Sequence, residues 1–402
     1  MHRSPSRRIA IAALAVGAAI AITGCSSPGA VSGAAGATTA PAAGDGRIAV
    51  SYQGGIRVLD ATTLRSVAEF DSEDFTRLNP AGDDRHVMVT MSKGFQVLDT
   101  AAGSGSEPRL TDLVFPAAKP GHVVHHGGRT ILYADGTSDT TVFETAALSK
   151  ADADLPETQV TRGVAAHHGV SVVLKDGTFL TTVGNAQGRT GITVTDPNGR
   201  VIAGSDQCPG VHGEGTAKDE AVVFGCENGA LIYKDGAITK LDAPTQPYGR
   251  MGNAYVSETS PLVVGDYKAD QDAEGYLLGA VTVIDTQAKT LKVVDMPAGA
   301  RYTFRDVARG PGDLAYILAT DGAVHVFDPS SGTFTGSFPV IAAWEGPAQW
   351  QDPHPLIAIS GNTAYVTEPA AKRLHSVDLS TGKVTATGEL GVAPVELAIA
   401  AG

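Results

Sequence analysis

Basic side chains are scarce in this sequence, which has 43 aspartates and glutamates but only 30 lysines and arginines, for a formal net charge of −13. Three of the arginines, Arg3, Arg7 and Arg8, lie at the N-terminus, and without them the formal charge is −16. Nucleic-acid binding depends on neutralising phosphates with basic residues. We therefore expect no nucleic-acid partner.

Long apolar runs are missing after the N-terminus, so no later segment predicts a membrane span. The N-terminus itself has a basic stretch, MHRSPSRR, followed by the apolar run IAIAALAVGAAIAI and the tetrapeptide ITGC, which ends at Cys25. This pattern predicts an export signal over residues 1–24. The tetrapeptide resembles the bacterial lipobox, which implies cleavage before Cys25 and lipidation of that cysteine. An ordinary secretory signal with a chance cysteine is the alternative.

Charged and bulky apolar side chains are almost absent from residues 25–46, which are rich in Ala, Gly, Ser, Thr and Pro. Such a segment cannot bury enough apolar surface to fold, so it predicts a flexible linker. The folded domain is expected over residues 47–402. With a lipidated Cys25, the linker would hold this domain at the outer face of a bacterial cytoplasmic membrane.

Cysteine is rare, with three in the whole chain. With Cys25 assigned to lipid, Cys208 and Cys226 remain as a pair. An exported protein folds in an oxidising compartment, where a disulfide is the default for two such cysteines. A thiolate metal pair is the alternative.

Helical periodicity is hard to find beyond residue 47, whereas short strand-like segments recur. HVMVTMSKGFQVLDTAAG (residues 86–103) and LAYILATDGAVHVFDPSSGTFTGSF (residues 314–338) share one pattern. A strand ends at a turn containing glycine, a second strand ends in Val-Leu-Asp or Val-Phe-Asp, and a turn leads to a third strand. Repeats of about 40–50 residues built from strands indicate the blades of a β-propeller.

The repeats predict an all-β fold with a single propeller of eight blades, with seven as the alternative. The first repeat lacks an innermost strand, and the C-terminal segment APVELAIA (residues 393–400) can supply it. Pairing the two chain ends in one blade would close the ring and leave no open edge. The repeats begin near Arg47, Thr76, Gly121, Gly163, Cys208, Gly249, Arg301 and Gln351.

Three histidine motifs lie on or just before the innermost strands of three consecutive repeats. They are GHVVHHGGRT (residues 121–130), GVAAHHGVSV (residues 163–172) and CPGVHGEGTA (residues 208–217). Innermost strands line the channel of a propeller, so these imidazoles are expected to converge there. His354 begins the innermost strand of the last repeat and is a fourth contributor. Neutral nitrogen donors favour zinc over calcium or magnesium.

The predicted zinc ligands are drawn from these motifs. Strand alternation puts His122 and His126 on the same face and His125 on the other. The choices between His125 and His126, and between His167 and His168, depend on a one-residue register that remains open. Glu214 or Asp352 could add an oxygen ligand or an acceptor for an imidazole N–H. The predicted ligands are His122, His126, His168, His212 and His354, whereas His2, His86, His325 and His375 are expected to be ordinary hydrogen-bonded residues.

The motifs resemble those of AztD-type zinc metallochaperones, above all in CPGVHGEGTAKDEAVVFGCENG (residues 208–229). The resemblance covers roughly residues 47–400. It implies a β-propeller, a disulfide joining Cys208 to Cys226, a zinc site made largely of histidines, and delivery of zinc to the solute-binding protein of a zinc ABC importer. Some members carry a flexible N-terminal segment rich in histidine and acidic residues, but residues 26–46 contain no histidine and one acid, Asp45. A second zinc site in the tail is therefore not expected.

Motifs for catalysis are also missing, since the chain has no G-x-S-x-G sequence and no candidate nucleophilic cysteine. We expect a monomeric protein that is not an enzyme. Two other functions stay open: a metal-dependent propeller hydrolase similar to lactonases, and a scaffold for protein–protein interaction with incidental histidines.

Overall fold

The computed structural model describes residues 46–151 and 154–402. The predicted signal segment, Cys25 and the linker up to residue 45 lie outside the described residues, as does His2. Strands dominate the part that is described, in which no helix is long and apolar enough to cross a membrane. Its only helical segments are three short 3-10 turns, Thr145–Lys150, Lys218–Glu220 and Pro311–Asp313.

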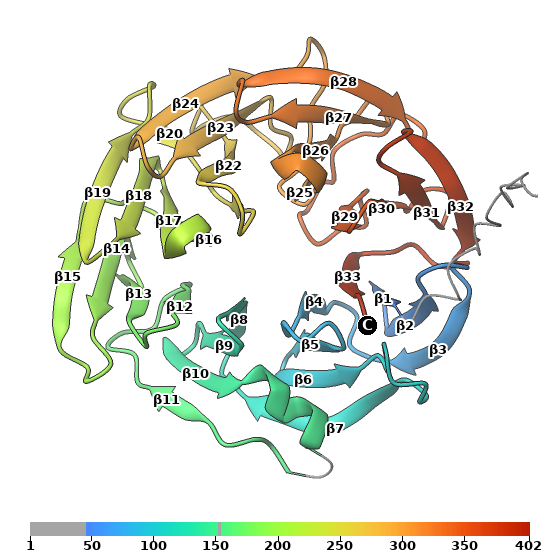
Figure 1. The fold of residues 1–402 in the computed structure, drawn as a ribbon, viewed down its shortest axis with the longest axis horizontal. Helices are drawn as coiled ribbons and strands as arrows, with labels where there is room; N and C mark the ends of the chain where they lie inside the picture. Colours follow the sequence, from blue (N-terminus) through green and yellow to red (C-terminus); the bar gives the residue numbers. More distant parts are fainter. Residues whose placement is uncertain (1–45, 152–153) are drawn as a thin grey trace, which may run out of the picture. The chain divides into compact units, whose positions relative to one another are not determined.

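Eight antiparallel sheets are arranged as blades around a central axis (Figure 1). The prediction of an eight-bladed propeller is therefore confirmed. Each blade has a path of four strands, one more than the three-strand repeat pattern, because a short innermost strand precedes the repeat. In blade order the strands are β1 (Arg47–Tyr52), β2 (Gly55–Asp60), β3 (Ser66–Asp71) with β33 (Glu396–Ala400); β4 (Arg77–Pro80), β5 (His86–Met91), β6 (Gly94–Asp99), β7 (Arg109–Pro116); β8 (Pro120–His126), β9 (Arg129–Ala134), β10 (Asp139–Glu144), β11 (Gln159–Thr161); β12 (Ser171–Val173), β13 (Phe179–Asn185), β14 (Gly188–Thr195), β15 (Val201–Ser205); β16 (His212–Ala217), β17 (Ala221–Cys226), β18 (Asn228–Lys234), β19 (Ala237–Asp242), with β20 (Gly249–Arg250) on β18; β21 (Ala254–Tyr255), β22 (Leu262–Tyr267), β23 (Ala280–Asp285), β24 (Thr290–Asp295); β25 (Val307–Arg309), β26 (Ala315–Leu318), β27 (Ala323–Asp328), β28 (Thr333–Pro339); and β29 (Ile357–Ser360), β30 (Thr363–Glu368), β31 (Arg373–Asp378), β32 (Lys383–Glu389).

The two ends of the propeller meet in one blade. β33 pairs antiparallel with β1, from Arg47 opposite Ala400 to Ser51 opposite Glu396. This pairing supplies the innermost strand that the first repeat lacks, as the sequence predicts. Because the last strand fills the first blade, the ring closes without an unpaired inner edge.

The aspartate that ends the second strand of many repeats has a structural role. Asp60 Oδ1 accepts hydrogen bonds from the backbone N–H groups of Thr62 (3.1 Å) and Thr63 (2.7 Å). Asp378 Oδ1 accepts one from the Ser380 N–H in the same way, at 2.9 Å. An aspartate that bonds the backbone two residues ahead stabilises a tight turn. The repeated Val-x-Asp pattern therefore marks the turns between the third and fourth strands of blades.

Apolar side chains fill the spaces between blades. Val58 of the first blade and Val87 of the second lie in one cluster, and both are fully buried. A larger cluster extends over the third to fifth blades and includes Leu180, Val194 and Phe224. Burial of each such side chain stabilises the fold by roughly 1.5–3 kcal/mol. This packing fixes the innermost strands of the blades that carry the histidine motifs.

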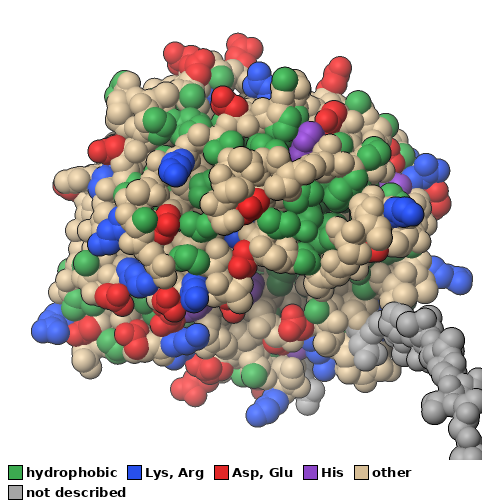
Figure 2. Space-filling view, turned by 45° about the horizontal axis from the view of Figure 1, so that its top comes forward, with side chains coloured by type: hydrophobic (Ala, Val, Ile, Leu, Met, Phe, Trp, Pro, Cys, Tyr) green, Lys and Arg blue, Asp and Glu red, His purple; other side chains and the backbone are tan. Residues whose placement is uncertain are grey.

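Charged side chains are interspersed on the surface in view in Figure 2, where Asp and Glu alternate with Lys and Arg. This face carries no single basic patch of the kind that contacts nucleic-acid phosphates.

Candidate metal centre

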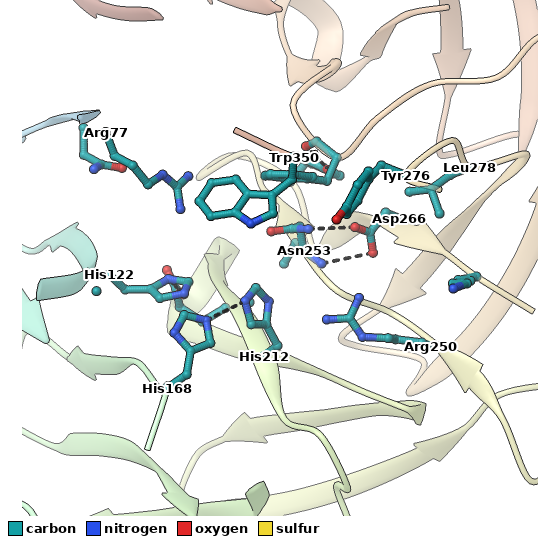
Figure 3. A pocket seen from close by; sticks show the side chains of 18 of the residues that line it. Arg77, His122, His168, His212, Arg250, Asn253, Asp266, Tyr276, Leu278 and Trp350 are labelled. Carbon is teal, nitrogen blue, oxygen red and sulfur yellow. Dashed lines mark hydrogen bonds and ion pairs between the residues drawn. The ribbon is translucent and has the colours of Figure 1, made fainter. Parts of the chain in front are cut away.

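Three histidines from three consecutive blades meet at the centre of the propeller. His122 lies on β8, His168 lies just before β12, and His212 begins β16. Their ring centroids are 5.1 Å (His122 to His168), 5.2 Å (His122 to His212) and 5.0 Å (His168 to His212) apart. One nitrogen of each ring lies within 4.8 Å of those of the others, so the three could hold a single metal ion. Figure 3 shows the three rings turned toward one another.

Irregularities in two innermost strands position two of these rings. The pairing of β8 with β9 shifts between Pro120 and Val123, and that of β16 with β17 shifts between His212 and Glu214. Each shift adds a residue to the inner strand, which is a β-bulge, and bulges re-aim neighbouring side chains. Gly213 is the extra residue in β16 and has a positive φ of 55°, a conformation that glycine adopts without a steric penalty.

The rings of His168 and His212 are held by acceptors at their Nδ1 atoms. Nδ1 of His168 lies 2.6 Å from Oδ2 of Asp135, and Nδ1 of His212 lies 2.6 Å from the carbonyl oxygen of Gly252. Since a carbonyl oxygen only accepts, His212 must donate from Nδ1, and the Asp135 carboxylate favours the same tautomer for His168. This arrangement leaves both Nε2 atoms free to bind a metal and is typical of zinc-binding histidines.

The two Nε2 atoms lie 3.0 Å from each other. In neutral rings with Nδ1–H both are acceptors, so a positive charge between them, either a proton on one ring or a metal ion, would stabilise this approach. Two nitrogens bound to one tetrahedral zinc at 2.0–2.1 Å would be about 3.4 Å apart. The observed separation is therefore close to the one that zinc requires.

Burial favours the neutral form of His122 and His212. It lowers the pKa of His212 to about 3, against a smaller opposing effect of its hydrogen bond to Gly252. Burial also lowers the pKa of His122 well below its ordinary value, and the neighbouring His212 and His168 lower it further. Neutral imidazole is the form that binds metal ions.

Glu214 is the carboxylate beside the cluster. Its Oε2 lies 3.9 Å from Nδ1 of His122, which is too far for a hydrogen bond, whereas Asp135 lies 2.6 Å from Nδ1 of His168. Burial raises the pKa of Glu214 to about 8. Asp352 does not reach the cluster, since its Oδ2 accepts the backbone N–H of Gln349 at 2.8 Å. Of the two carboxylates predicted from the sequence, Glu214 is the one that the fold brings close.

A cavity of about 630 Å³ opens above the three histidines. Besides the histidines and Glu214, cations and aromatic rings line it (Figure 3). Its cationic and large aromatic residues include Arg77, Arg250, Lys268, Tyr276, Phe304 and Trp350.

His126 is not brought into the cluster, although strand alternation predicts it on the same face as His122. It ends β8, about 13 Å along an extended strand from His122, and its Nε2 lies 2.7 Å from Oε1 of Glu220. The bulge after Pro120 also interrupts the alternation on which the prediction depends. His126 therefore forms an ion pair or hydrogen bond with the fifth blade instead.

His354 is not brought into the cluster either. His354 is 2% exposed, and its Nδ1 lies 2.7 Å from the carbonyl oxygen of Asp352, two residues earlier in the same turn. Its Nε2 is buried without a hydrogen-bond partner. Burial lowers its pKa to about 4. The expected ring of four imidazoles is thus a group of three.

The fold separates the adjacent histidines of the second motif. His167 is buried, and its Nε2 lies 3.0 Å from the Tyr133 hydroxyl and 3.1 Å from Oγ1 of Thr182. Its neighbour His168 has a side chain that is 44% exposed and points to the cluster. The other single histidines have acidic partners, as expected: His86 with Asp83, His325 with Asp321 and His375 with Glu368.

A disulfide joins Cys208 to Cys226, as predicted, and both cysteines are fully buried. Cys208 precedes His212 by four residues, and Cys226 ends β17, the strand that pairs with β16. The bridge therefore secures the segment that enters β16 at His212.

Several residues of the site are not predicted from the sequence. Asp135 lies in an ordinary ADGT turn, which predicts a hairpin and nothing more. Gly252 contributes only a backbone carbonyl, which carries no side-chain signal. Arg77, Arg250 and Trp350 lie near the starts of the second, sixth and eighth repeats and have no local motif. Only the ring closure of the propeller brings them to one cavity.

The fold and the site define an eight-bladed β-propeller with a candidate three-histidine metal centre at its axis. The chain is similar to the zinc chaperone AztD of Citrobacter koseri, with 25% identity over 287 residues, which are 69% of this chain and 65% of the relative. The match therefore spans less than two thirds of the relative's length. No family model matches the chain.

Solved structures support the same fold. The structure of apo AztD from Citrobacter koseri has a TM-score of 0.72 and 22% identity, and the match covers 88% of this chain and 97% of that one. The dihydro-heme d1 dehydrogenase NirN matches with a TM-score of 0.58 and 12% identity, over 88% of this chain and 74% of that one. The resemblance to AztD-type proteins that the motifs indicate is confirmed in both sequence and fold.

Proposed function

We propose that this protein is a zinc metallochaperone that holds zinc at His122, His168 and His212. The observation that carries the proposal is the 3.0 Å approach of the His168 and His212 Nε2 atoms, each in a ring whose Nδ1 is held by a separate acceptor. Three neutral nitrogen donors suit zinc better than calcium or magnesium. The similarity to a protein named as a zinc chaperone supports the same cargo.

The chain's own residues would prepare the site for its cargo. Asp135 and the Gly252 carbonyl fix two rings, and Glu214 lies beside the third, 3.9 Å from Nδ1 of His122. Zinc would displace the proton needed between the Nε2 atoms of His168 and His212. The donor set is three imidazoles that line the cavity, so a bound zinc ion would have a fourth tetrahedral position for another ligand.

Delivery would use this fourth position. A ligand from the acceptor protein enters there while a histidine leaves, so that zinc is never released into solution. The acceptor we propose is the solute-binding protein of a zinc ABC importer. Lipidation of Cys25 would keep the chaperone beside the membrane and so raise its effective concentration near the importer.

The compartment is consistent with this role. The Cys208–Cys226 disulfide fits an oxidising environment outside the cytoplasm. The export signal predicted at the N-terminus also indicates a location outside the cytoplasm.

Two measurements on the purified chain test the proposal. After removal of metal with a chelator, reloading should give one zinc per chain that resists a competing chelator. Mixed with the solute-binding protein, the loaded chain should transfer zinc faster than it releases zinc spontaneously. Transfer no faster than release would contradict the chaperone role. Absence of tight zinc binding would leave only a scaffold function.

A metal-dependent hydrolase is the second candidate, because three histidines with an open fourth position are also the donor set of catalytic zinc sites. Turnover of esters or lactones by the zinc-loaded chain would favour it. The chaperone proposal predicts no such turnover above that of the metal-stripped chain.

A further inference from the structure

The cavity above the histidines is much larger than its proposed cargo needs. Its volume is about 630 Å³, whereas one water molecule takes about 30 Å³ in the liquid. Pockets of roughly 300–1,000 Å³ are those that bind small organic ligands in proteins. The site therefore has room for a small molecule in addition to a metal ion.

The charge of this cavity does not suit a bare cation. Arg77, Arg250 and Lys268 line it, against two carboxylates, Glu214 and Asp266. In Figure 3, Arg77 and Arg250 lie on opposite sides of the three histidines. A site for a divalent cation that is lined by more positive than negative side chains requires a further negative charge.

The guanidinium groups of both arginines are available for an anion. Within residues 46–151 and 154–402, the side chain of Arg250 forms no hydrogen bond or ion pair. Arg77 has one long ion pair, 3.5 Å from its Nε to Oε1 of Glu396, and this Nε has no hydrogen-bond partner. Lys268, in contrast, is used internally, since its Nζ donates to the carbonyl oxygen of Ala273 at 2.8 Å.

Within the described residues, neither carboxylate of the cavity forms an ion pair with these arginines, although the charge of Arg250 partly offsets the rise that burial causes in the pKa of Asp266. Asp266 accepts hydrogen bonds from the backbone of Gly252 and from the backbone and side chain of Asn253, at 3.1 Å and 2.7 Å for the latter two. Oε2 of Glu214 lies 3.9 Å from Nδ1 of His122. The three histidines, Arg250 and the weakly paired Arg77 therefore share one cavity, into which a fourth ligand of a bound metal could reach.

We propose that this cavity binds a small organic dicarboxylate together with zinc, one carboxylate taking the fourth coordination position beside Arg250 and the other pairing with Arg77. The proposal rests on the zinc site of the proposed function. A carboxylate oxygen is an ordinary zinc ligand at 2.0–2.2 Å, and arginine binds carboxylates through two parallel hydrogen bonds. Cζ of Arg77 lies 5.8 Å from the ring centroid of Trp350, and this ring adds apolar surface to the cavity lining.

Succinate is the probe, because it carries two carboxylates and chelates zinc weakly. Isothermal titration calorimetry should show succinate binding to the zinc-loaded full chain about 10-fold or more tightly than to the metal-stripped chain, since coupled ligands raise each other's affinity equally. Acetate, with one carboxylate, should bind at least about 10-fold more weakly than succinate. Equal binding of acetate, or equal binding with and without zinc, would overturn the proposal.

Substitutions test whether Arg77 and Arg250 bind the two carboxylates of succinate. Arg77→Gln and Arg250→Gln should each weaken succinate binding about 10-fold or more, whereas Arg200→Gln, at an exposed ion pair with Asp196, should leave it unchanged. Succinate affinity that survives both substitutions would contradict the assignment.

Cobalt gives a second readout of coordination. The visible absorption bands of the cobalt-loaded chain should shift when succinate is added, because a carboxylate oxygen enters the coordination shell. Unchanged bands would overturn coordination by the dicarboxylate. A chain that binds no zinc at all would end the proposed function itself. A chain that binds zinc but not succinate would overturn only the dicarboxylate proposal and would leave the proposed zinc site standing.

Discussion

The Nε2 atoms of His168 and His212 lie 3.0 Å apart, although the two residues belong to adjacent blades and are 44 positions apart in the chain. The other nitrogen of each ring is tied to its own acceptor, Asp135 or the Gly252 carbonyl. Two acceptor nitrogens are therefore held against each other by groups outside the pair. A cation between the two nitrogens would remove the repulsion between their lone pairs, so this arrangement favours cation binding.

Substitution of the three clustered histidines tests the ligand set. His122→Ala, His168→Ala and His212→Ala should each weaken zinc binding by about 100-fold or more, since loss even of a supporting residue costs 10–100-fold. Competition with a chromophoric chelator measures the effect.

His126→Ala is the matched control, because His126 lies on the same strand as His122 but pairs with Glu220. Its zinc affinity should equal that of the unchanged chain. A loss of affinity in His126→Ala as large as that in His122→Ala would show that the ligand set is wrong.

Asp135→Asn tests the support of His168. The amide would bind Nδ1–H more weakly than the carboxylate does, so we expect a 10–100-fold loss of zinc affinity with the fold retained. Asp176→Asn is the control, since Asp176 begins the same Asp-Gly-Thr sequence in a turn of the next blade and accepts the Thr178 N–H. If both variants bind zinc equally well, the support by Asp135 is not functional.

Gly213→Ala tests the bulge in β16. A Cβ at Gly213 would collide with the Gly252 carbonyl oxygen, the acceptor of His212, and φ here is positive. We expect weaker zinc binding and a small loss of stability, measured by chelator competition and thermal unfolding. Gly236→Ala also has a positive φ but open space around its Cβ, so it should lower stability without lowering zinc affinity.

The disulfide should stabilise both the fold and the site. In the chain-entropy model a bridge across 18 residues contributes about 3 kcal/mol. Replacing both cysteines with serine should therefore lower the denaturant midpoint. Zinc affinity should fall as well, because the segment entering β16 at His212 loses its anchor. Unchanged zinc affinity would show that packing alone positions His212.

Stability should fall in acid partly through His354. Its pKa is about 4 in the folded chain and about 6.5 when unfolded, so between these values the unfolded chain binds the proton more tightly. The folded state therefore loses about 2 kcal/mol from this group as the pH falls from 7.5 to 5. Urea unfolding at both pH values measures the loss.

His354→Asn keeps a donor for the Asp352 carbonyl but does not titrate, so its stability should change less over the same pH interval. The comparison isolates this residue from the other buried acids of the chain, such as Asp306, whose pKa burial raises. An identical pH dependence in the two proteins would contradict the buried neutral state of His354.

The fold was largely predictable because its signals are local and repeated. Turn residues such as Asp60 and Asp378 recur at the same place in the repeat, where each caps a turn through its own carboxylate. The segment after Ala393 is too short to form a further repeat. It instead supplies the innermost strand that the first blade lacks. Eight copies of a weak pattern are enough to define the architecture.

The site was only partly predictable. His122, His168 and His212 follow from their positions at innermost strands, but His126 and His354 do not join them. Alternation along β8 predicted His126, and the bulge after Pro120 breaks that alternation. A single inserted residue reverses side-chain directions, and no feature of the local sequence marks it.

The sequence by itself determined the strand repeats and which segments approach the axis, because each depends on residues close together in the chain. It also predicted the pairing of the chain ends, because the first repeat lacks a strand that the last segment can supply. Only the tertiary structure decided which imidazoles meet, which acceptors hold them and which arginines share their cavity. Asp135, Gly252, Arg77 and Arg250 reach the histidines from other turns and other blades. Their distances are set by the closure of the whole ring, to which every blade contributes.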